Sequence, residues 1–306
     1  MRSTGTAAPP RRRRGNRGTD RSAQALVLSL PASLVVGLLF VVPLGLLVWM
    51  SMTDWPLLGE PSFVGLAQYG AILDDPLFLD AVWFTVRYTV ITTVILTVVA
   101  LGLALLVQQT RLGTGLLRTA FFLPASMGLA VASLLWFALY SDEVGPLSDL
   151  LMAVGLVDEP VNWLGTPGGA LWSTVLMVLW RFAGFYMIIL LTGLQSIPTQ
   201  VYEAARIDGA GWWRTFTGVT LPLLRPTLAL VLVLSVTGSL LAFEQFYVLT
   251  GGGPDNSTVT VVATIFRQAF TLFDLSRAAA MSVVVLIALV LANIVQLSLI
   301  RKGGDS

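Results

Sequence analysis

Long apolar stretches separated by shorter polar segments run along almost the whole chain. Six of them approach the roughly 20 residues that a helix needs to cross the hydrocarbon core of a bilayer. They cover residues 26–50, 82–107, 119–140, 170–194, 223–249 and 279–300. The pattern predicts an all-α integral membrane protein of six transmembrane helices. We expect one membrane domain over residues 25–302, between polar tails at 1–24 and 303–306.

The composition agrees with lipid as the main solvent of this chain. Hydrophobic residues make up 56% of the 306 residues, charged residues make up 11%, and the mean hydropathy is +0.82. A soluble domain carries about 25% charged residues. The first apolar stretch is too long for the apolar region of a signal peptide, so we expect it to remain in the mature protein.

Charges are distributed unevenly among the polar segments. The loops 51–81 and 141–169 hold acidic residues but no Lys or Arg, whereas the loops 108–118 and 195–226 hold arginines. Positive segments stay in the cytoplasm, so we expect both termini there. The tail 1–24 cannot build a core and is predicted to be disordered. We interpret its run Arg11–Arg14 as an orientation signal, and we expect the bilayer, not a nucleic acid, as its neighbour.

Missing residue types exclude several kinds of chemistry. The chain has no Cys and no His, which excludes disulfides, thiolate catalysis and Cys/His metal sites. Its single lysine, Lys302, is not preceded by the glycine-rich run of a nucleotide-binding loop. We therefore expect no catalytic residues, no metal site and no cofactor in this chain.

The segment 196–222 has the pattern of a short helix, a turn and a second short helix. Pro198 suits the first turn of a helix, where its missing N–H costs nothing. Gly209 offers the left-handed conformation that ends a helix. We expect the second helix to run from about Ala210 until Pro222 interrupts it. Because Ala and Gly leave the surface of this loop low, the backbone of another protein could approach it closely.

The same segment resembles a known signature. Glu-Ala-Ala-x-x-Asp-Gly-Ala from Glu203, followed at a fixed distance by Leu-Pro, is similar to the cytoplasmic loop of permeases in bacterial binding-protein-dependent ABC importers. One position departs from the pattern, because Val219 stands where Ile is usual. The resemblance implies the type I importer permease fold and a loop that couples the membrane helices to an ATPase. The implied coupling residues are Glu203, Ala204, Ala205, Asp208, Gly209, Val219, Leu221 and Pro222.

The resemblance also implies partners and a location. Two ATP-binding subunits would hold ATP and Mg²⁺, a second permease, expected to be a different chain, would complete the path, and an extracytoplasmic solute-binding protein would deliver the cargo. The location would be the bacterial plasma membrane. Segments such as Phe63–Tyr69 and Leu249–Pro254 resemble those of carbohydrate permeases, in particular the first of the paired maltose- or glycerol-3-phosphate-type subunits. The implied cargo is a sugar, an oligosaccharide or a glycerol phosphate.

Two ionisable residues fall inside predicted spans, Arg181 in the fourth and Glu244 in the fifth. A charge at the bilayer centre costs about 2.5–3.5 kcal/mol on insertion scales, so each needs a partner or a wet cavity. They could face each other across the path or flank a bound solute; alternatively, they could lie near the outer interface. Aromatic and amide groups that suit sugars are found on the same spans. The expected path residues are Arg181, Phe182, Tyr186, Phe243, Glu244, Gln245 and Tyr247.

Within this set, the resemblance places Tyr186 on a sugar-contact position of maltose-type relatives, whereas Glu244 stands where Asp or Asn is more familiar. The main alternative is a stand-alone secondary carrier driven by an ion gradient. Such carriers have discontinuous helices and buried carboxylates that bind the coupling ion. Only Glu244 offers such a carboxylate, and a carrier would not need the signature in the loop 196–222.

Overall fold

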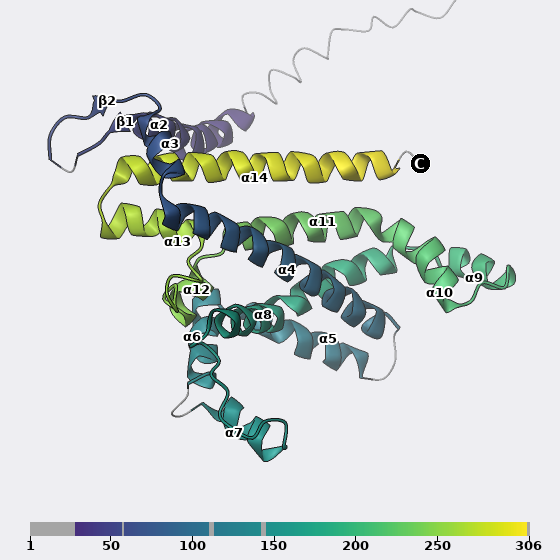
Figure 1. Ribbon diagram of the computed structural model, residues 1–306. Helices are drawn as coiled ribbons and strands as arrows, with labels where there is room; N and C mark the ends of the chain where they lie inside the picture. The colour runs from purple at the N-terminus through teal and green to yellow at the C-terminus, as the bar shows by residue number, and fades with distance from the viewer. Residues whose placement is uncertain (1–27, 57, 110–112, 142–144, 305–306) are drawn as a thin grey trace, which may run out of the picture. The chain divides into compact units, whose positions relative to one another are not determined.

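The computed structural model describes residues 28–56, 58–109, 113–141 and 145–304, and the side chains as far as Ser298 (Figure 1). It divides into two compact units, Met1–Trp49 and Met50–Ser306. The predicted disordered tail 1–24 lies outside the described residues. At the other end, a helix continues to Gly304, two residues past the predicted end of the membrane domain.

The first unit is described as one apolar helix from Leu28, which continues to Ser51. It contains a π turn, η1 (Gly37–Val41), followed by α2 (Val42–Ser51). No side chain between Leu28 and Trp49 is buried within the protein. A helix that is apolar along its length suits a lipid environment.

The second unit is almost entirely helical. Its one small sheet pairs β1 (Thr53–Asp54) antiparallel with β2 (Ser62–Phe63), with Thr53 opposite Phe63. The helices are α3 (Ala67–Leu73), α4 (Pro76–Val107), α5 (Thr114–Phe122), η2 (Leu123–Ser126), α6 (Leu129–Leu139), α7 (Pro146–Ala153), α8 (Pro167–Gln195), α9 (Thr199–Ile207), α10 (Trp212–Thr215), η3 (Phe216–Thr220), α11 (Leu221–Leu240), α12 (Glu244–Leu249), α13 (Val261–Phe266), η4 (Arg267–Thr271) and α14 (Leu275–Gly304).

Two long helices begin earlier than the apolar pattern predicts. The α4 helix starts at Pro76, where the Asp75 carboxylate accepts hydrogen bonds from the backbone N–H groups of Leu77 and Phe78. The α8 helix starts at Pro167, with Thr166 Oγ1 accepting from Gly169 N over 3.0 Å. Because caps satisfy the free N–H groups of the first turn, a polar residue fixes the start of each helix, whatever the hydropathy.

The described residues contain five helices that are long and apolar enough to cross a membrane, and a sixth span if one bent pair is counted. That pair corrects the predicted third span, 119–140. Thr114–Ser126 and Leu129–Leu139 meet at 97° and do not form one straight helix. The bend follows Pro124, and Met127 is extended (φ −78°, ψ 145°). Proline removes a backbone donor and the 3₁₀ turn around it ends the helix, which a count of apolar residues does not detect.

The predicted fifth span, 223–249, is also wrong in its extent. The helix begins at Trp212, ends at Leu240, and is followed by the non-helical residues 241–243 and the short helix α12. Phe243 has φ −143° and ψ −65°. Non-helical backbone at membrane depth is tolerated where protein buries it or where it lines a wet cavity. Glu244 therefore lies just after a break and not inside a continuous span.

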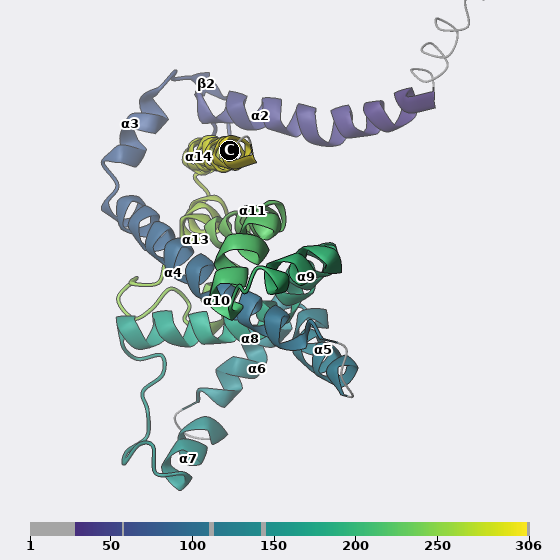
Figure 2. The same ribbon diagram turned by 90° about the vertical axis from the view of Figure 1, so that its right-hand side faces the viewer.

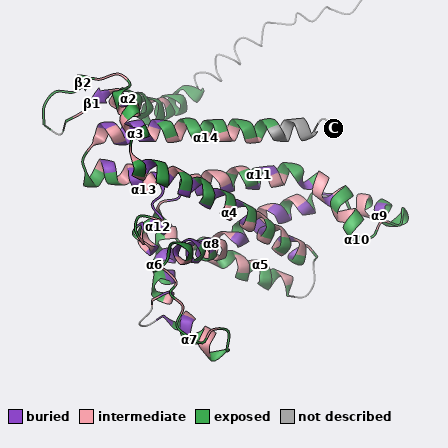
Figure 3. Cartoon of the chain, viewed as in Figure 1, coloured by how far each residue is buried: buried purple, intermediate pink, exposed green. Residues whose placement is uncertain are grey.

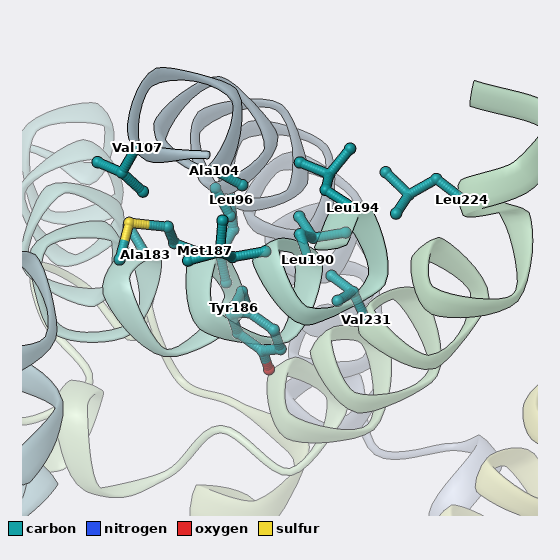
Figure 4. Close-up of a cluster of buried hydrophobic side chains, with 12 residues drawn as sticks. Leu96, Ala104, Val107, Ala183, Tyr186, Met187, Leu190, Leu194, Leu224 and Val231 are labelled. Carbon is teal, nitrogen blue, oxygen red and sulfur yellow. The ribbon is translucent and has the colours of Figure 1, made fainter. Parts of the chain in front are cut away.

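The core of the second unit forms where α4, α8 and α11 pack together (Figure 4). Ala100 and Ala104 of α4 are fully buried there, as are Met187 and Leu190 of α8. Small residues let helices approach closely in lipid, where the hydrophobic effect does not drive helices together. Figure 3 shows buried residues along the inner sides of α4 and α8, while much of α14 is exposed.

Two threonines of α4 form hydrogen bonds to other helices. Ser235 Oγ of α11 donates to Thr93 Oγ1 of α4 over 3.2 Å, and Val261 N of α13 donates to Thr85 Oγ1 of α4 over 3.0 Å. Figures 1 and 2 show α9, α10 and the C-terminal ends of α4 and α14 on one side of the second unit. The location of these segments in the cytoplasm, expected from the arginine pattern, stays a prediction.

Candidate functional site: a central cavity and a surface loop

A cavity of about 340 Å³ opens at the break that follows α11. Its walls come from α4, α6, α8, α11, the break itself, α12 and α13. The lining residues are Tyr88, Thr92, Leu96, Leu129, Val178, Phe182, Tyr186, Ser235, Gly238, Ser239, Leu241, Ala242, Phe243, Glu244, Gln245 and Val262. Five of the seven expected path residues lie in this wall: Phe182, Tyr186, Phe243, Glu244 and Gln245.

The α8 wall of the cavity is one helical face. Val178, Phe182 and Tyr186 are spaced four residues apart, so their side chains line up along the helix. The Phe182 and Tyr186 rings lie 6.5 Å apart between centroids, and Tyr186 is buried. Figure 4 shows the Tyr186 hydroxyl pointing away from the buried aliphatic side chains of α8. An apolar wall with a phenol at its edge suits the face and hydroxyls of a sugar ring.

A hydrogen bond connects two walls of the cavity, those formed by α4 and α12. Gln245 Nε2 of α12 donates to Tyr88 Oη of α4 over 3.3 Å, and both side chains are buried. Gln245 Oε1 is buried and finds no hydrogen-bond partner among the described residues. Leaving such an acceptor unpaired costs about 1–3 kcal/mol, so a donor from water or a ligand would be stabilising here.

Sequence reasoning missed four polar residues in the cavity wall: Tyr88, Thr92, Ser235 and Ser239. Each pair is spaced four residues apart on one helix, Tyr88 with Thr92 on α4 and Ser235 with Ser239 on α11. That spacing was available as a signal for a polar face.

Arg181 and Tyr247 do not line the cavity. The Arg181 guanidinium carbon lies 4.8 Å from the centroid of the Phe182 ring, and Arg181 Nε is buried without a hydrogen-bond partner in the described structure. Within the described residues, no ion pair joins Arg181 to Glu244, whereas Arg277 pairs with Asp274 over 3.5 Å. Whether Arg181 and Glu244 flank a solute stays a prediction.

Tyr247 faces a different space. Its ring packs against Phe243 (5.1 Å) and Phe266 (5.5 Å), and it lines a neighbouring cavity of about 270 Å³. This cavity lies beside the loop that contains Gly251 and Gly252. No cluster of three His, Cys, Asp or Glu side chains that could hold a metal ion occurs in the part of the chain that the structure describes.

The surface loop 196–222 contains the expected first helix and turn. Pro198 is the N-cap of α9 and not part of its first turn, one residue away from the prediction. Gly209 has φ +71°, the left-handed conformation expected after the helix. Ala205 is buried, whereas Glu203, Ala204 and Asp208 are exposed. The expected coupling residues of α9 therefore lie on its solvent face, and Ala205 lies beneath them.

Ile207 is an additional exposed residue of this face. Its side chain is 86% exposed, and it lies one turn after Glu203 on α9. A large aliphatic side chain held in solvent on a short helix is a candidate protein contact. The signal for Ile207 in the sequence is a large aliphatic residue beside Glu203, Ala204 and Asp208 on a short helix.

The second helix of the loop corrects the prediction that it ends at Pro222. One helix runs from Trp212 to Leu240, through α10, η3 and α11. The π turn Phe216–Thr220 contains Gly218, four residues before Pro222, so the wider turn accommodates the proline ring. The same arrangement occurs in η1, which precedes Pro43. Val219, Leu221 and Pro222 are half-buried and continuous with the membrane span.

Comparison with known proteins agrees with this architecture. A family model described as "Binding-protein-dependent transport system inner membrane component" matches residues 17–302. The sulfoquinovosyl glycerol transport system permease protein SmoG of Agrobacterium fabrum is 34% identical over 284 residues, covering 92% of this chain and 91% of that protein. The trehalose/maltose transport system permease protein MalF of Thermococcus litoralis is 32% identical over 280 residues, covering 91% and 94%.

The fold is also found among solved structures. A chain in the crystal structure of a bacterial ABC transporter involved in the import of the acidic polysaccharide alginate has a TM-score of 0.80 at 20% identity, covering 92% of this chain and 96% of that one. The expected importer permease fold is thereby confirmed. Since the family model covers most of the chain and both relatives exceed 30% identity over nine-tenths of it, this chain belongs to the family of binding-protein-dependent transport system inner membrane components.

Proposed function

We propose that this chain forms one half of the translocation path of an ATP-driven importer of carbohydrates. The cavity at the break after α11 carries the proposal. It combines the rings of Phe182 and Tyr186 with the buried amide of Gln245 and several hydroxyl groups. Aromatic faces suit sugar rings and amides suit sugar hydroxyls, so the wall matches this class of cargo.

The relatives support the same cargo class. Their names refer to sulfoquinovosyl glycerol and to trehalose and maltose. In this chain the cargo would pass between Tyr186 on α8 and Gln245 on α12, with a second permease, a different chain, forming the other half of the path. An extracytoplasmic solute-binding protein would deliver the cargo.

The solvent face of α9 is the proposed contact for the ATPase. Glu203, Ala204, Ile207 and Asp208 lie on or next to this face, and Gly209 ends the helix. The helix from Trp212 to Leu240 then carries motion of the loop directly to the cavity, because Ser235 and Ser239 belong to it. ATP and Mg²⁺ would bind to two partner ATPase subunits, and this chain would contribute no catalytic residue. The complex would lie in the bacterial plasma membrane with both termini of this chain in the cytoplasm.

One observation favours the alternative, an ion-coupled carrier. The break at 241–243 places the Glu244 carboxylate at the cavity, as in carriers whose discontinuous helices bind a coupling ion. Family membership and the exposed α9 face weigh against this alternative, because a carrier needs no ATPase contact.

Purification and transport measurements distinguish the importer from the ion-coupled carrier. The tagged chain and its Glu203→Ala/Gly209→Asp variant are purified from native membranes, and the wild-type complex is placed in lipid vesicles. Three results together would support the importer. An ATPase and a second permease accompany the wild type, and less ATPase accompanies the variant. Uptake of maltose or trehalose requires ATP on the side of the vesicle membrane where the ATPase lies. Uptake by the isolated chain under a proton or sodium gradient, without ATP, would establish the carrier.

A further inference from the structure

The charge of the cavity is one-sided. Among its described lining residues Glu244 is the single acidic side chain, and no Lys or Arg is present. The remaining polar lining groups are the hydroxyls of Tyr88, Thr92, Tyr186, Ser235 and Ser239 and the amide of Gln245. Two arginines adjoin lining residues in the sequence and lie outside the lining: Arg87 holds its guanidinium over the Phe84 ring, and Arg181 holds its guanidinium over the Phe182 ring.

From this distribution we infer that Glu244 makes the path selective for uncharged or cationic carbohydrates and excludes anionic ones, such as uronates and sugar phosphates. The inference rests on the proposed carbohydrate path and adds the charge class of its cargo. Neither the fold nor the family fixes this property, because a protein of the same fold belongs to an importer of an acidic polysaccharide and a relative at 34% identity is named for the sulfonated sugar sulfoquinovosyl glycerol. The lining side chains of each chain must therefore decide it.

The position of Glu244 lets its negative charge act on a solute in the cavity. It is the first residue of α12, directly after the non-helical segment 241–243, and its side chain is exposed. At a separation of about 4–6 Å in a medium of intermediate dielectric, the repulsion between two like charges weakens binding by more than about tenfold. A neutral sugar would instead donate its hydroxyls to the carboxylate, a charge-assisted hydrogen bond.

Gln245 next to it offers little to an anion. One N–H of its Nε2 already donates to Tyr88 Oη, and its Oε1 is a buried acceptor without a partner among the described residues, which an anion cannot satisfy. The cavity thus offers two acceptors side by side, the Glu244 carboxylate and Gln245 Oε1. Both fit the hydroxyl or ammonium donors of a cargo, whereas a carboxylate or phosphate on the cargo brings acceptors only.

The test uses the complex that co-purifies with this chain, in lipid nanodiscs, and measures sugar binding by calorimetry. Maltose, trehalose, lactose and sucrose are the neutral probes. For each binder, the form with a carboxylate in place of one 6-hydroxymethyl group and the form with a 6-amino group are compared. The wild type is expected to bind the neutral and amino forms at least about tenfold more tightly than the carboxylate form. In Glu244→Gln, which keeps the shape of the side chain, this gap is expected to shrink to about threefold or less.

Asp80→Asn is the matched control, because Asp80 is an exposed carboxylate of α4 outside the cavity; it is expected to keep the full gap. Equal or tighter binding of the carboxylate form by the wild type would overturn the charge selection and leave the carbohydrate path standing. An unchanged gap in Glu244→Gln would overturn the role of Glu244. If neither neutral nor charged sugars bind, the carbohydrate path itself fails, and the charge inference fails with it.

Discussion

Gln245 donates a hydrogen bond from Nε2 to Tyr88 Oη over 3.3 Å, joining α12 to α4 across 157 positions of the sequence. The bond holds the segment after the break against the helix that carries Thr92, so two walls of the cavity keep a fixed separation. Removing one partner of such a buried pair costs free energy, because the remaining polar group is left without water or a hydrogen bond. The geometry of the cavity therefore depends on a contact that neither helix could specify alone.

Replacing the phenol tests this contact. Tyr88→Phe removes the acceptor for Gln245 Nε2, and we expect the sugar concentration for half-maximal uptake to rise about 3–10-fold with little change in protein yield. Tyr140→Phe is the control, since Tyr140 Oη donates to Ser173 O outside the cavity. A Tyr88→Phe protein that transports with wild-type affinity would contradict the role of the bond.

Gly184 sets the distance between α8 and the helix before the third-span bend. A Cβ at this position would collide with the backbone carbonyl of Phe121. We expect Gly184→Ala to lower the thermal midpoint in detergent by roughly 3–10 °C, the consequence of about 1–3 kcal/mol of overpacking. Gly102→Ala in α4, where a Cβ would meet no atom within 4 Å, should leave the midpoint unchanged or raise it slightly. Equal midpoints for the two variants would refute the close approach.

Two threonines one turn apart on α4 should respond differently to the same substitution. Thr85 Oγ1 accepts the Val261 N–H, whereas Thr89 Oγ1 is buried with no hydrogen-bond partner among the described residues. Thr85→Val leaves a buried N–H unpaired and is expected to destabilise the protein by about 1–3 kcal/mol. Thr89→Val removes an unsatisfied hydroxyl and should be neutral or stabilising. Chemical denaturation in mixed micelles measures both; a larger loss for Thr89→Val would be inconsistent with this geometry.

Ile207 should matter for the ATPase and not for the fold. Because its side chain is 86% exposed, Ile207→Asp removes no core contact, and the thermal midpoint should stay within about 2 °C of the wild type. If the α9 face docks on an ATPase, a charge there should reduce co-purified ATPase at least about fivefold, whereas Ile207→Leu, which keeps an apolar side chain, should retain it. Undiminished ATPase with Ile207→Asp would exclude Ile207 from the contact.

The sequence by itself determined much of the architecture and one surface. Long apolar runs predicted six spans, and the described residues contain five helices that could cross a membrane, or six if the bent pair is counted, because the energetics of lipid act on each segment locally. Gly209 predicted the end of α9, since only the local backbone conformation is involved. Phe182, Tyr186 and Gln245 were found as candidates from their residue types within a span.

The tertiary structure decided where the spans break and what those breaks bring together. Pro222 was expected to end a helix, yet a π turn accommodates it, while the fifth span ends at Leu240 without a proline to mark the position. Tyr88 joined the cavity wall only because α4 packs beside α12 and α8. Hydrophobic periodicity records which side of a helix avoids water, but it does not record which helix meets that side. The cavity depends on several helices converging, so its lining follows from packing between distant segments.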